Sequence, residues 1–257
     1  MSKLRVLDLF AGFGGFSLGL EKTGGFETVA FCEISLYPRL VLAKNWTEVP
    51  QYDDVRTLTA QRLAADGLAV DVITGGFPCQ DISVAGKQAG IAEGTRSGLW
   101  SECIRLVSEL RPRFAIFENV ANLLAGPSGQ PGKWFSRILS DLASIGYDAE
   151  WENIPASALG APHRRERVWL VAYPSQERYA GEILCKNNKK SDFNFPRTSL
   201  LPPYSDGMVT AEDNYSLRPG DGFSEFMGEL NGYGNAVVPQ IPELIGNAIL
   251  ESMKEAA

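Results

Sequence analysis

Apolar and polar residues follow two different periods along the chain, and the alternation of these periods predicts its strands and helices. Short apolar runs, typical of strands buried on both faces, lie at 4–10, 28–32, 70–74 and 114–117. Segments with helical spacing of the apolar residues alternate with these runs and lie at 16–23, 36–45, 57–66, 98–110 and 132–145. Strands that alternate with helices in this way indicate an α/β fold with a doubly wound, mostly parallel, Rossmann-like sheet.

The pattern changes after residue 145. Two further strands are predicted at 147–154 and 168–173, and because a loop separates them we expect an antiparallel hairpin at the edge of the sheet. From 174 to 231 the periodicity fades, and Pro, Gly, Ser and Asn interrupt the chain repeatedly, which is typical of a small irregular second module. Helical spacing returns at 237–253, and we expect that helix to pack back onto the first part of the chain.

Length and composition fit one large domain with a small appendage. The chain has 257 residues, of which 44% are hydrophobic, enough for a sizeable core. Its first residues lead directly into a charged strand and do not resemble a signal peptide, and no run of about 18 apolar residues could span a membrane. We therefore expect a cytoplasmic protein without a membrane partner.

The cysteines are expected to be reduced. There are four of them, they lack the C-x-x-C spacing of a zinc site, and they are too sparse for a disulfide framework. His163 is the single histidine, so the sequence also predicts no metal site built from paired Cys and His ligands.

Charge limits the kinds of partner that the chain can bind. The formal net charge of -7 and the pI of about 4.9 argue against a protein that coats nucleic acid indiscriminately, because phosphate contacts need Lys and Arg. Basic residues are nevertheless clustered in two places, as Arg164, Arg165 and Arg167 and as Lys186, Lys189 and Lys190. These clusters are compatible with a basic cleft on an acidic body and also with a solvated surface.

Candidate chemistry begins with Cys79, which follows the apolar run 70–74 after a short loop that contains two glycines. Pro78 fixes its own φ and biases Phe77 towards an extended conformation, so the backbone that leads to the thiol has little freedom. Such pre-organisation suits a nucleophile. Taken alone, however, a cysteine is more often a small buried core residue.

A glycine-rich turn follows the first predicted strand. The spacing Gly12-Phe-Gly-Gly15 differs from the dinucleotide pattern G-x-G-x-x-G, and Asp8 precedes the glycines. A P-loop is excluded because no Gly-Lys-Ser or Gly-Lys-Thr follows. What remains is a nucleoside-type ligand without a pyrophosphate. Glu33 ends the next apolar run, where a carboxylate can accept hydrogen bonds from ribose hydroxyls in doubly wound folds.

Five short motifs occur in one order along the chain. They are Phe-Ala-Gly-x-Gly-Gly at 10–15, Pro-Cys-Gln at 78–80, Glu-Asn-Val at 118–120, Arg-Glu-Arg at 165–167 and Gly-Asn at 234–235. Each is a weak match alone, but the ordered set closely resembles the cytosine-5 DNA methyltransferases over residues 3–172 and 232–250. The resemblance implies a DNA (cytosine-5-)-methyltransferase that transfers a methyl group from S-adenosyl-L-methionine to carbon 5 of a flipped-out cytosine in duplex DNA.

The resemblance also implies the roles of the catalytic residues. Cys79 would add to carbon 6 of the base and form a covalent adduct. Glu118 would contact the ring nitrogen and the exocyclic amine; the alternative is that it caps a helix beginning near Asn119. Arg165 and Arg167 lie two residues apart, so on an extended segment both face one side, where one can hold the carbonyl oxygen of the base while the other braces the site. An exposed basic loop is the competing interpretation.

The cofactor that the resemblance implies is S-adenosyl-L-methionine. Phe10 would stack on the adenine, Glu33 would bind the ribose, and the glycines of the turn would admit the methionine part. Asp54 would contact the adenine, with Asp53 as an adjacent alternative, and for Leu99 core packing is nearly as good an explanation. The predicted cofactor-binding residues are Phe10, Ala11, Gly12, Gly14, Gly15, Glu33, Asp54, Val55, Pro78, Leu99, Asn235 and Ala236. The predicted substrate-binding residues are Gln80, Ser83 and Asn119.

The resemblance divides the chain into three parts. Residues 1–173 would form the catalytic and cofactor-binding domain, 174–231 a reduced target-recognition module, and 232–257 a segment that packs back onto the catalytic domain. The chain departs from the family pattern at His163, where the arginine motif usually has glutamine. It also departs at 225–233, which lacks both the usual Arg-Leu-Gln-Gly-Phe-Pro-like element and any basic residue.

Two other functions stay open at this point. A tRNA cytosine-5 methyltransferase would use the same catalytic residues, since a branch of the family acts on transfer RNA. A catalytically silent nucleic-acid-binding homologue would fit the acidic charge and the missing recognition element. The predicted partner is double-stranded DNA, and the family implies a monomer. The recognition sequence stays open, as does the choice between a cognate restriction endonuclease, protection of a phage genome and regulation of expression.

Overall fold

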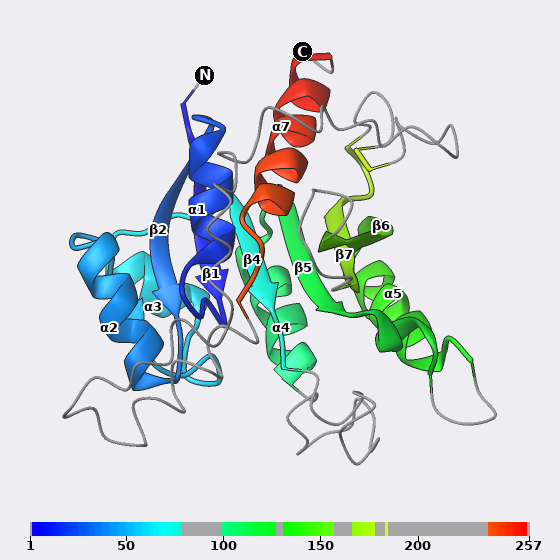
Figure 1. The fold of residues 1–257 in the computed structure, drawn as a ribbon, viewed down its shortest axis with the longest axis horizontal. Helices are drawn as coiled ribbons and strands as arrows, with labels where there is room; N and C mark the ends of the chain where they lie inside the picture. The colour runs from blue at the N-terminus through cyan, green and yellow to red at the C-terminus, as the bar shows by residue number, and fades with distance from the viewer. Residues whose placement is uncertain are drawn as a thin grey trace, which may run out of the picture.

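The computed structural model describes residues 2–78, 99–126, 131–156, 166–177, 183–184 and 236–255. One seven-stranded sheet organises them, with the strand order β3-β2-β1-β4-β5-β7-β6 (Figure 1). Its strands are β1 Leu4–Leu9, β2 Phe26–Cys32, β3 Gln51–Tyr52, β4 Val72–Gly76, β5 Phe114–Val120, β6 Tyr147–Pro155 and β7 Glu166–Pro174. Strands β1 to β5 pair in parallel, whereas β7 is antiparallel to both β5 and β6. The predicted α/β fold, mostly parallel with an antiparallel edge pair, is therefore confirmed.

Helices cover both faces of the sheet, as in a doubly wound fold (Figure 1). On one face α1, Gly15–Lys22, and α7, Gln240–Glu255, lie side by side. Helix α2, Leu36–Asn45, is followed by Trp46, whose indole N–H donates a hydrogen bond to Glu21 of α1. The other face carries α3, Ala60–Ala65, α4, Trp100–Leu110, and α5, Lys133–Ser144. A short 3-10 helix, η2, Ala121–Leu124, follows β5.

Each face of the sheet has its own apolar core. Phe16 of α1, Trp169 of β7 and Ile245 of α7 are buried together on one face. On the other face Trp100 packs against the rings of Phe77 and Phe117, with ring centroids 5.2 and 5.1 Å away. The central strands β1, β4 and β5 are buried on both sides because both sides are covered, which explains their continuous apolar runs in the sequence.

Helix α7 is held against α1 by close backbone contacts. A Cβ atom on Gly19 would overlap the carbonyl oxygen of Pro239, just before α7. Gly246, inside α7, leaves room for Leu20 and Phe26, to which a Cβ atom would lie 2.9 and 3.1 Å away. Only glycine permits these approaches, so the C-terminal helix lies directly against α1.

Three elements differ from those that the apolar pattern predicts. Strand β3 has only two residues, too few for a recognisable period, and the pattern misses it. Helix α3 begins at Ala60, because the Oγ1 of Thr59 accepts a hydrogen bond from the backbone N–H of Arg62 at 3.1 Å and so caps the helix. Strand β5 continues beyond 117 to Val120, so Glu118 lies inside a strand and not at the start of a helix.

The segment 174–231 lies outside the described residues, apart from 174–177 and 183–184, and so does the predicted irregular module. None of the helices in the described part combines the length and the apolar character that a membrane crossing requires.

Candidate active site

The candidate residues gather at the carboxyl ends of the parallel strands. The strand order reverses between β1 and β4, and open α/β sheets bind ligands in the crevice beside such a reversal. Phe10 and Ala11 follow β1, Glu33 follows β2, and Pro78 follows β4 after one intervening residue. Residues that are far apart in the sequence therefore meet at one edge of the sheet.

The glycine-rich turn has a left-handed backbone and is tied to Glu33. Phe10 has a φ of 52°, which is unusual for a residue with a bulky side chain, and Gly12 has a φ of 53°. The N–H of Gly12 donates to Glu33 Oε2 at 2.9 Å, and the N–H of Ser35 donates to Glu33 Oε1 at 2.8 Å. Among the described residues, a Cβ atom on Gly12 would meet nothing within 4 Å, so they leave the turn open on that side. A strained residue beside open space is typical of a ligand-binding turn.

Gly14 and Gly15 have structural reasons to be glycine. A Cβ atom on Gly14, whose φ is 79°, would lie 2.8 Å from the ring of Trp46, and one on Gly15 would lie 2.6 Å from the carbonyl oxygen of Val237. Ala236 directly precedes Val237, so the C-terminal segment reaches the turn. The cofactor contacts of Gly14, Gly15 and Ala236 stay predictions.

Asp8 is a functional candidate that the motifs miss. Its side chain is completely buried, and its Oδ2 and Oδ1 accept hydrogen bonds from Ser17 Oγ at 2.9 Å and Thr74 Oγ1 at 2.7 Å. Burial raises the pKa of Asp8 to about 7, although both hydroxyl donors oppose the shift. These bonds join β1, α1 and β4, the elements that carry the turn and the approach to Cys79. The signal in the sequence is a lone acid within an apolar strand.

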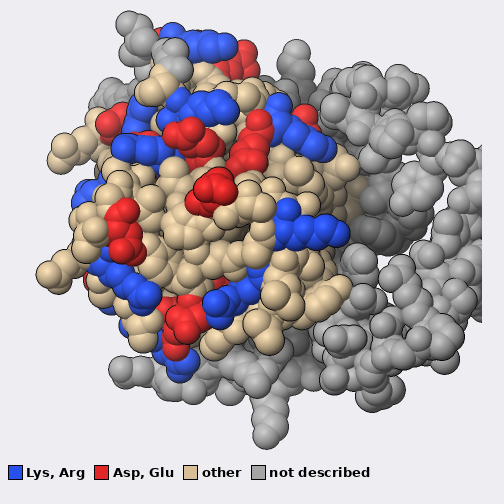
Figure 2. All heavy atoms as spheres, turned by 90° about the vertical axis from the view of Figure 1, so that its left-hand side faces the viewer, with Lys and Arg blue, Asp and Glu red and all other residues tan. Residues whose placement is uncertain are grey.

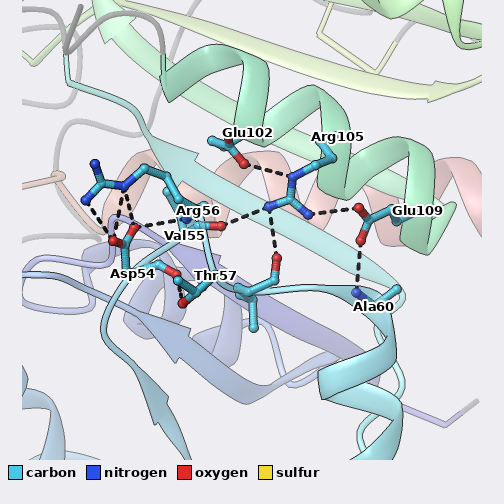
Figure 3. A network of polar contacts seen from close by, with 9 residues as sticks. Asp54, Val55, Arg56, Thr57, Ala60, Glu102, Arg105 and Glu109 are labelled. Carbon is cyan, nitrogen blue, oxygen red and sulfur yellow. Dashed lines mark hydrogen bonds and ion pairs between the residues drawn. The ribbon is translucent and has the colours of Figure 1, made fainter. Parts of the chain in front are cut away.

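Asp54 lies on the loop after β3 and is bound by Arg56 (Figure 3). The Nη2 of Arg56 donates to Asp54 Oδ2 at 2.7 Å, and the Nε donates to Oδ1 at 2.9 Å. The hydrogen bond from Arg56 holds the pKa of Asp54 below its usual value. Asp53 is exposed and Val55 is buried. Both Asp53 and Asp54 therefore stay candidates for an adenine contact.

Leu99 directly precedes α4 and packs against the apolar core on that face of the sheet. Core packing, which the sequence offers as the other explanation for Leu99, is thus observed. The contact of Leu99 with the cofactor stays a prediction.

Glu118 and Arg167 form an ion pair at the same edge of the sheet, on the side of β5 and β7. The Nε of Arg167 lies 2.7 Å from Glu118 Oε1, and the two side chains are only 21% and 11% exposed. The antiparallel register of β5 and β7, in which Val120 pairs with Arg167, brings them together. A Cβ atom on Gly76 would lie 3.2 Å from Glu118 Oε2, so glycine at this position leaves room for the carboxylate. Arg167 therefore lies on a strand and not in an exposed basic loop.

Asn119 fixes the chain that leads to Cys79. Its Nδ2 donates to the carbonyl oxygen of Phe77 at 3.1 Å, and its side chain is buried. Phe77 is itself buried against Trp100, and it precedes Pro78 and Cys79. A residue that the sequence predicts as a substrate contact thus has an observed positioning contact, and the substrate contact stays a prediction.

The two cysteines in the described part are poor nucleophiles. Cys32 and Cys103 are buried, and burial raises the pKa of Cys32 to about 12 and also raises the pKa of Cys103. Both therefore remain thiols at neutral pH. Cys79 and Cys185 lie outside the described residues, so neither described cysteine competes with Cys79 for the role of nucleophile.

Several predicted residues lie outside the described part, namely Cys79, Gln80, Ser83, Arg165, Asn235, His163 and the lysines at 186, 189 and 190. Within the described ranges, no group of three or more His, Cys, Asp or Glu side chains could hold a metal ion.

The surface on the side of α2 carries both signs of charge. Figure 2 shows the side of the molecule on which α2 lies, and there Lys and Arg side chains are interspersed with Asp and Glu. Interspersed charges produce only weak long-range fields. Of the arginine cluster at 164–167, the structure describes only Arg167, so the expected basic cleft stays a prediction.

The motifs, their order and the fold agree with one protein family. A model of the C-5 cytosine-specific DNA methylase family matches residues 4–219, which is most of the chain. The chain belongs to this family. The resemblance inferred from the five motifs is therefore confirmed.

Three methylase relatives show how much of a family member the chain spans. The Type II methyltransferase M.Sau3AI of Staphylococcus aureus is 34% identical over 191 residues, 70% of this chain and 46% of that protein. The Type II methyltransferase M.Bsp6I of Bacillus sp. (strain RFL6) is 31% identical over 216 residues, 84% of this chain and 63% of that protein. The orphan methyltransferase M.SPRI of Bacillus phage SPR is 31% identical over 204 residues, 78% and 43% of the two chains. The chain thus spans about half the length of these relatives.

Solved structures share the fold of this chain. A prophage-encoded protein of E. coli is 28% identical, with a TM-score of 0.58 over 70% of this chain and 49% of that chain. DNMT2 of Spodoptera frugiperda is 20% identical, with a TM-score of 0.57 over 70% of this chain and 53% of that chain, which shows a shared fold alone.

Proposed function

We propose that the protein is a DNA (cytosine-5-)-methyltransferase that uses S-adenosyl-L-methionine and forms a covalent adduct between Cys79 and carbon 6 of a flipped-out cytosine. The observation that carries the proposal is the ion pair of Glu118 and Arg167, with 2.7 Å between Oε1 and Nε. This pair lies beside Gly76, just before Cys79 in the chain, and at the same edge as the glycine-rich turn. Membership of the C-5 cytosine-specific DNA methylase family supports the same chemistry.

The residues of the turn fit S-adenosyl-L-methionine. No residue in the described part of the chain approaches the open side of Gly12, and each oxygen of Glu33 accepts one backbone hydrogen bond, which leaves capacity for ribose hydroxyls. Phe10 follows β1 in a left-handed conformation, and we assign its ring to the adenine. When bound, the cofactor supplies an electrophilic methyl group on its sulfonium. We assign further contacts to Ala11, Gly14, Gly15, Asp54, Val55, Pro78, Leu99, Asn235 and Ala236.

Cys79 is the nucleophile in this proposal. Carbon 5 of cytosine is a poor nucleophile, so the thiolate first bonds to carbon 6, and the electrons of the ring double bond become available at carbon 5. The bond from Asn119 to Phe77 and the fixed φ of Pro78 restrict the backbone before the thiol. Once carbon 5 carries the methyl group, the proton on that carbon leaves and Cys79 is eliminated, which restores the ring double bond and the thiolate.

Glu118 and the two arginines bind the base in this proposal. Glu118 contacts the ring nitrogen and the exocyclic amine, where a protonated carboxyl group neutralises the negative charge that thiolate addition puts on the ring. Arg167 already bonds to Glu118, so we assign it the bracing role. Arg165 is then the residue that holds the carbonyl oxygen of the base.

Duplex DNA is the proposed substrate. A stacked base hides its edge from a thiol, so the target nucleotide must be flipped out, which costs a few kcal/mol. We assign Gln80 and Ser83 to the DNA backbone and the gap, and the segment 174–231 to target recognition. The names of the relatives, two Type II methyltransferases and an orphan phage methyltransferase, fit a modification enzyme with or without a cognate restriction endonuclease. We assign it the monomeric state that the family implies.

The test is transfer of a labelled methyl group from S-adenosyl-L-methionine to mixed-sequence duplex DNA, beside transfer RNA and with Cys79→Ala as the control. We expect label on DNA cytosine that disappears in Cys79→Ala. A duplex with 5-fluorocytosine at the target should trap the adduct, because no proton can leave from carbon 5, and the covalent complex should be visible on a denaturing gel. Label on RNA alone would overturn the DNA substrate, and no label on either would indicate a silent homologue.

A further inference from the structure

Arg105 of α4 is bonded at all three of its nitrogens (Figure 3). Its Nη2 donates to the carbonyl oxygens of Val55 and Leu58, each at 2.9 Å. Its Nε and Nη1 donate to Glu102 Oε2 and Glu109 Oε1, each at 2.8 Å. The guanidinium thus joins α4 to the loop after β3, and the two glutamates on its own helix hold it in place.

Glu109 ties the far end of the same loop. Its second oxygen, Oε2, accepts a hydrogen bond from the N–H of Ala60 at 3.0 Å, and Ala60 is the first residue of α3. The loop from 53 to 59 is therefore attached to α4 at both its middle and its end. Trp100 and Cys103 of α4 are buried in the core on this face of the sheet. The bonds to α4 therefore hold the loop at a fixed position relative to that core.

The loop is attached to the core by the buried side chains of Val55 and Leu58 and to α4 by Arg105. Its internal bonds run from the N–H groups of Thr57 and Leu58 to the carbonyl oxygen of Asp54, at 3.1 and 3.2 Å. These bonds shape the turn but do not themselves attach it to α4. The carbonyl groups of Val55 and Leu58 face Arg105, so any shift of this backbone must break two charge-assisted bonds in addition to disturbing the two buried side chains.

We propose that Arg105 is a positioning residue for the cofactor, which holds Asp54 and Val55 where the adenine binds. The inference rests on the proposed use of S-adenosyl-L-methionine and adds a residue that touches neither cofactor nor substrate. A loop displaced by about 1 Å would lose much of the binding energy of the ligand that it contacts. The defect should therefore appear in the binding of the cofactor and not in the chemical step at saturation.

A purely structural role would leave a different pattern. Arg105 also makes ion pairs within α4, with Glu102 at i−3 and Glu109 at i+4, and such pairs on exposed helices contribute little. Glu102→Gln removes one ion pair but leaves Arg105 and both of its carbonyl bonds. If the ion pairs were the important contacts, Glu102→Gln and Arg105→Met would weaken cofactor binding alike.

The test compares Arg105→Met with Arg137→Met. Among the described residues Arg137 bonds only to Asp141, four residues later on its own helix α5. Arg137 therefore has an ion pair like that of Arg105 with Glu109 but makes no bond to a loop carbonyl group among those residues. Calorimetry should show that Arg105→Met raises the Kd for S-adenosyl-L-methionine by about tenfold, equivalent to about 1.4 kcal/mol. We expect Arg137→Met and Glu102→Gln to leave this Kd within about twofold of the unaltered protein. In methyl transfer, KM for the cofactor should rise in Arg105→Met while kcat at saturation stays unchanged.

Arg105→Lys is a more conservative variant that keeps the proposal testable if Arg105→Met does not fold. Lysine keeps the charge and can reach one glutamate or one carbonyl oxygen but not all four partners, so its Kd should fall between those of the unaltered protein and Arg105→Met. An unchanged Kd in Arg105→Met, or a fall in kcat with an unchanged KM, would overturn the positioning role. Failure of the unaltered protein to bind S-adenosyl-L-methionine would instead overturn the proposed function on which the inference rests, and the inference with it.

Discussion

The two halves of the carboxyl edge both place an arginine on a carboxylate, but in different surroundings. On the base side, Arg167 of β7 reaches Glu118 of β5, and the side chains are 21% and 11% exposed. On the cofactor side, Arg56 reaches Asp54 within one loop, and the side chains are 60% and 26% exposed. Both pairs have a closest distance of 2.7 Å. Although the distances are equal, breaking the two pairs should have different costs, because water can replace a lost partner only at the exposed pair.

Breaking the covered pair should have the largest effect. Arg167→Met removes the cation that lies 2.7 Å from Glu118, whose carboxylate stays mostly out of water, so we expect a loss of about 3 kcal/mol in the free energy of unfolding. Methyl transfer should fall by at least about a hundredfold, because the charged group that orients Glu118 is gone. Urea unfolding and the labelled-methyl assay measure the two effects. Equal losses in Arg167→Met and Arg56→Met would contradict the comparison.

Gly76→Ala tests the same pair without removing a charge. The new Cβ atom would lie 3.2 Å from Glu118 Oε2 and would push the carboxylate by a few tenths of an ångström. We expect methyl transfer to fall by about tenfold, while the free energy of unfolding changes by less than about 1 kcal/mol. Gly67→Ala is the control, since its Cβ atom would meet nothing within 4 Å but its φ of 75° is unfavourable for alanine. A control that lost activity in proportion to stability would show that strain, and not Glu118, explains Gly76→Ala.

The fold was predictable from the sequence because its central strands are buried on both faces. Continuous apolar runs marked β1, β2, β4 and β5, and the loss of that pattern after 145 marked the antiparallel pair. Strand β3 could not be found in this way, since its position depends on pairing with β2 and not on its own two residues. The start of α3 depends on one capping hydroxyl, that of Thr59, which the apolar period does not register.

The candidate site was predictable only where a motif names a residue. Glu118 and Arg167 belong to two motifs, and antiparallel pairing brings them together. Arg105 and Gly76 act through neighbours that are distant in the sequence, so neither has a local pattern that reveals its contacts. Asp8 does have a local signal, as an acid inside an apolar strand, but its partners Ser17 and Thr74 follow only from the packing of α1 and β4.

Asp8 lies between the two halves and has hydroxyl partners in place of an arginine. Its pKa in the folded protein is raised to about 7, so the folded state holds the proton more tightly than the unfolded chain does. The stabilisation is complete below about pH 4 and is lost as the pH rises through 7, with a slope on the order of 1 kcal/mol per pH unit. Asp8→Asn cannot ionise, so the difference in unfolding free energy between the two proteins should change over this range. Parallel curves from pH 5 to pH 8 in urea unfolding would rule out the shift.

Arg56→Met should have the smallest effect, because it breaks the exposed pair. Arg56 lowers the pKa of Asp54, so the pair stabilises the folded state at neutral pH and stops doing so as the pH falls through that lowered pKa. The melting temperature of Arg56→Met should therefore lie slightly below that of the unaltered protein at pH 7, and the two should converge at acidic pH. The Kd for S-adenosyl-L-methionine at pH 7 should change by less than about threefold, since water replaces the arginine. A tenfold change would mean that Arg56 itself contacts the ligand, and the cofactor half of the edge would then depend on its ion pair as strongly as the base half does.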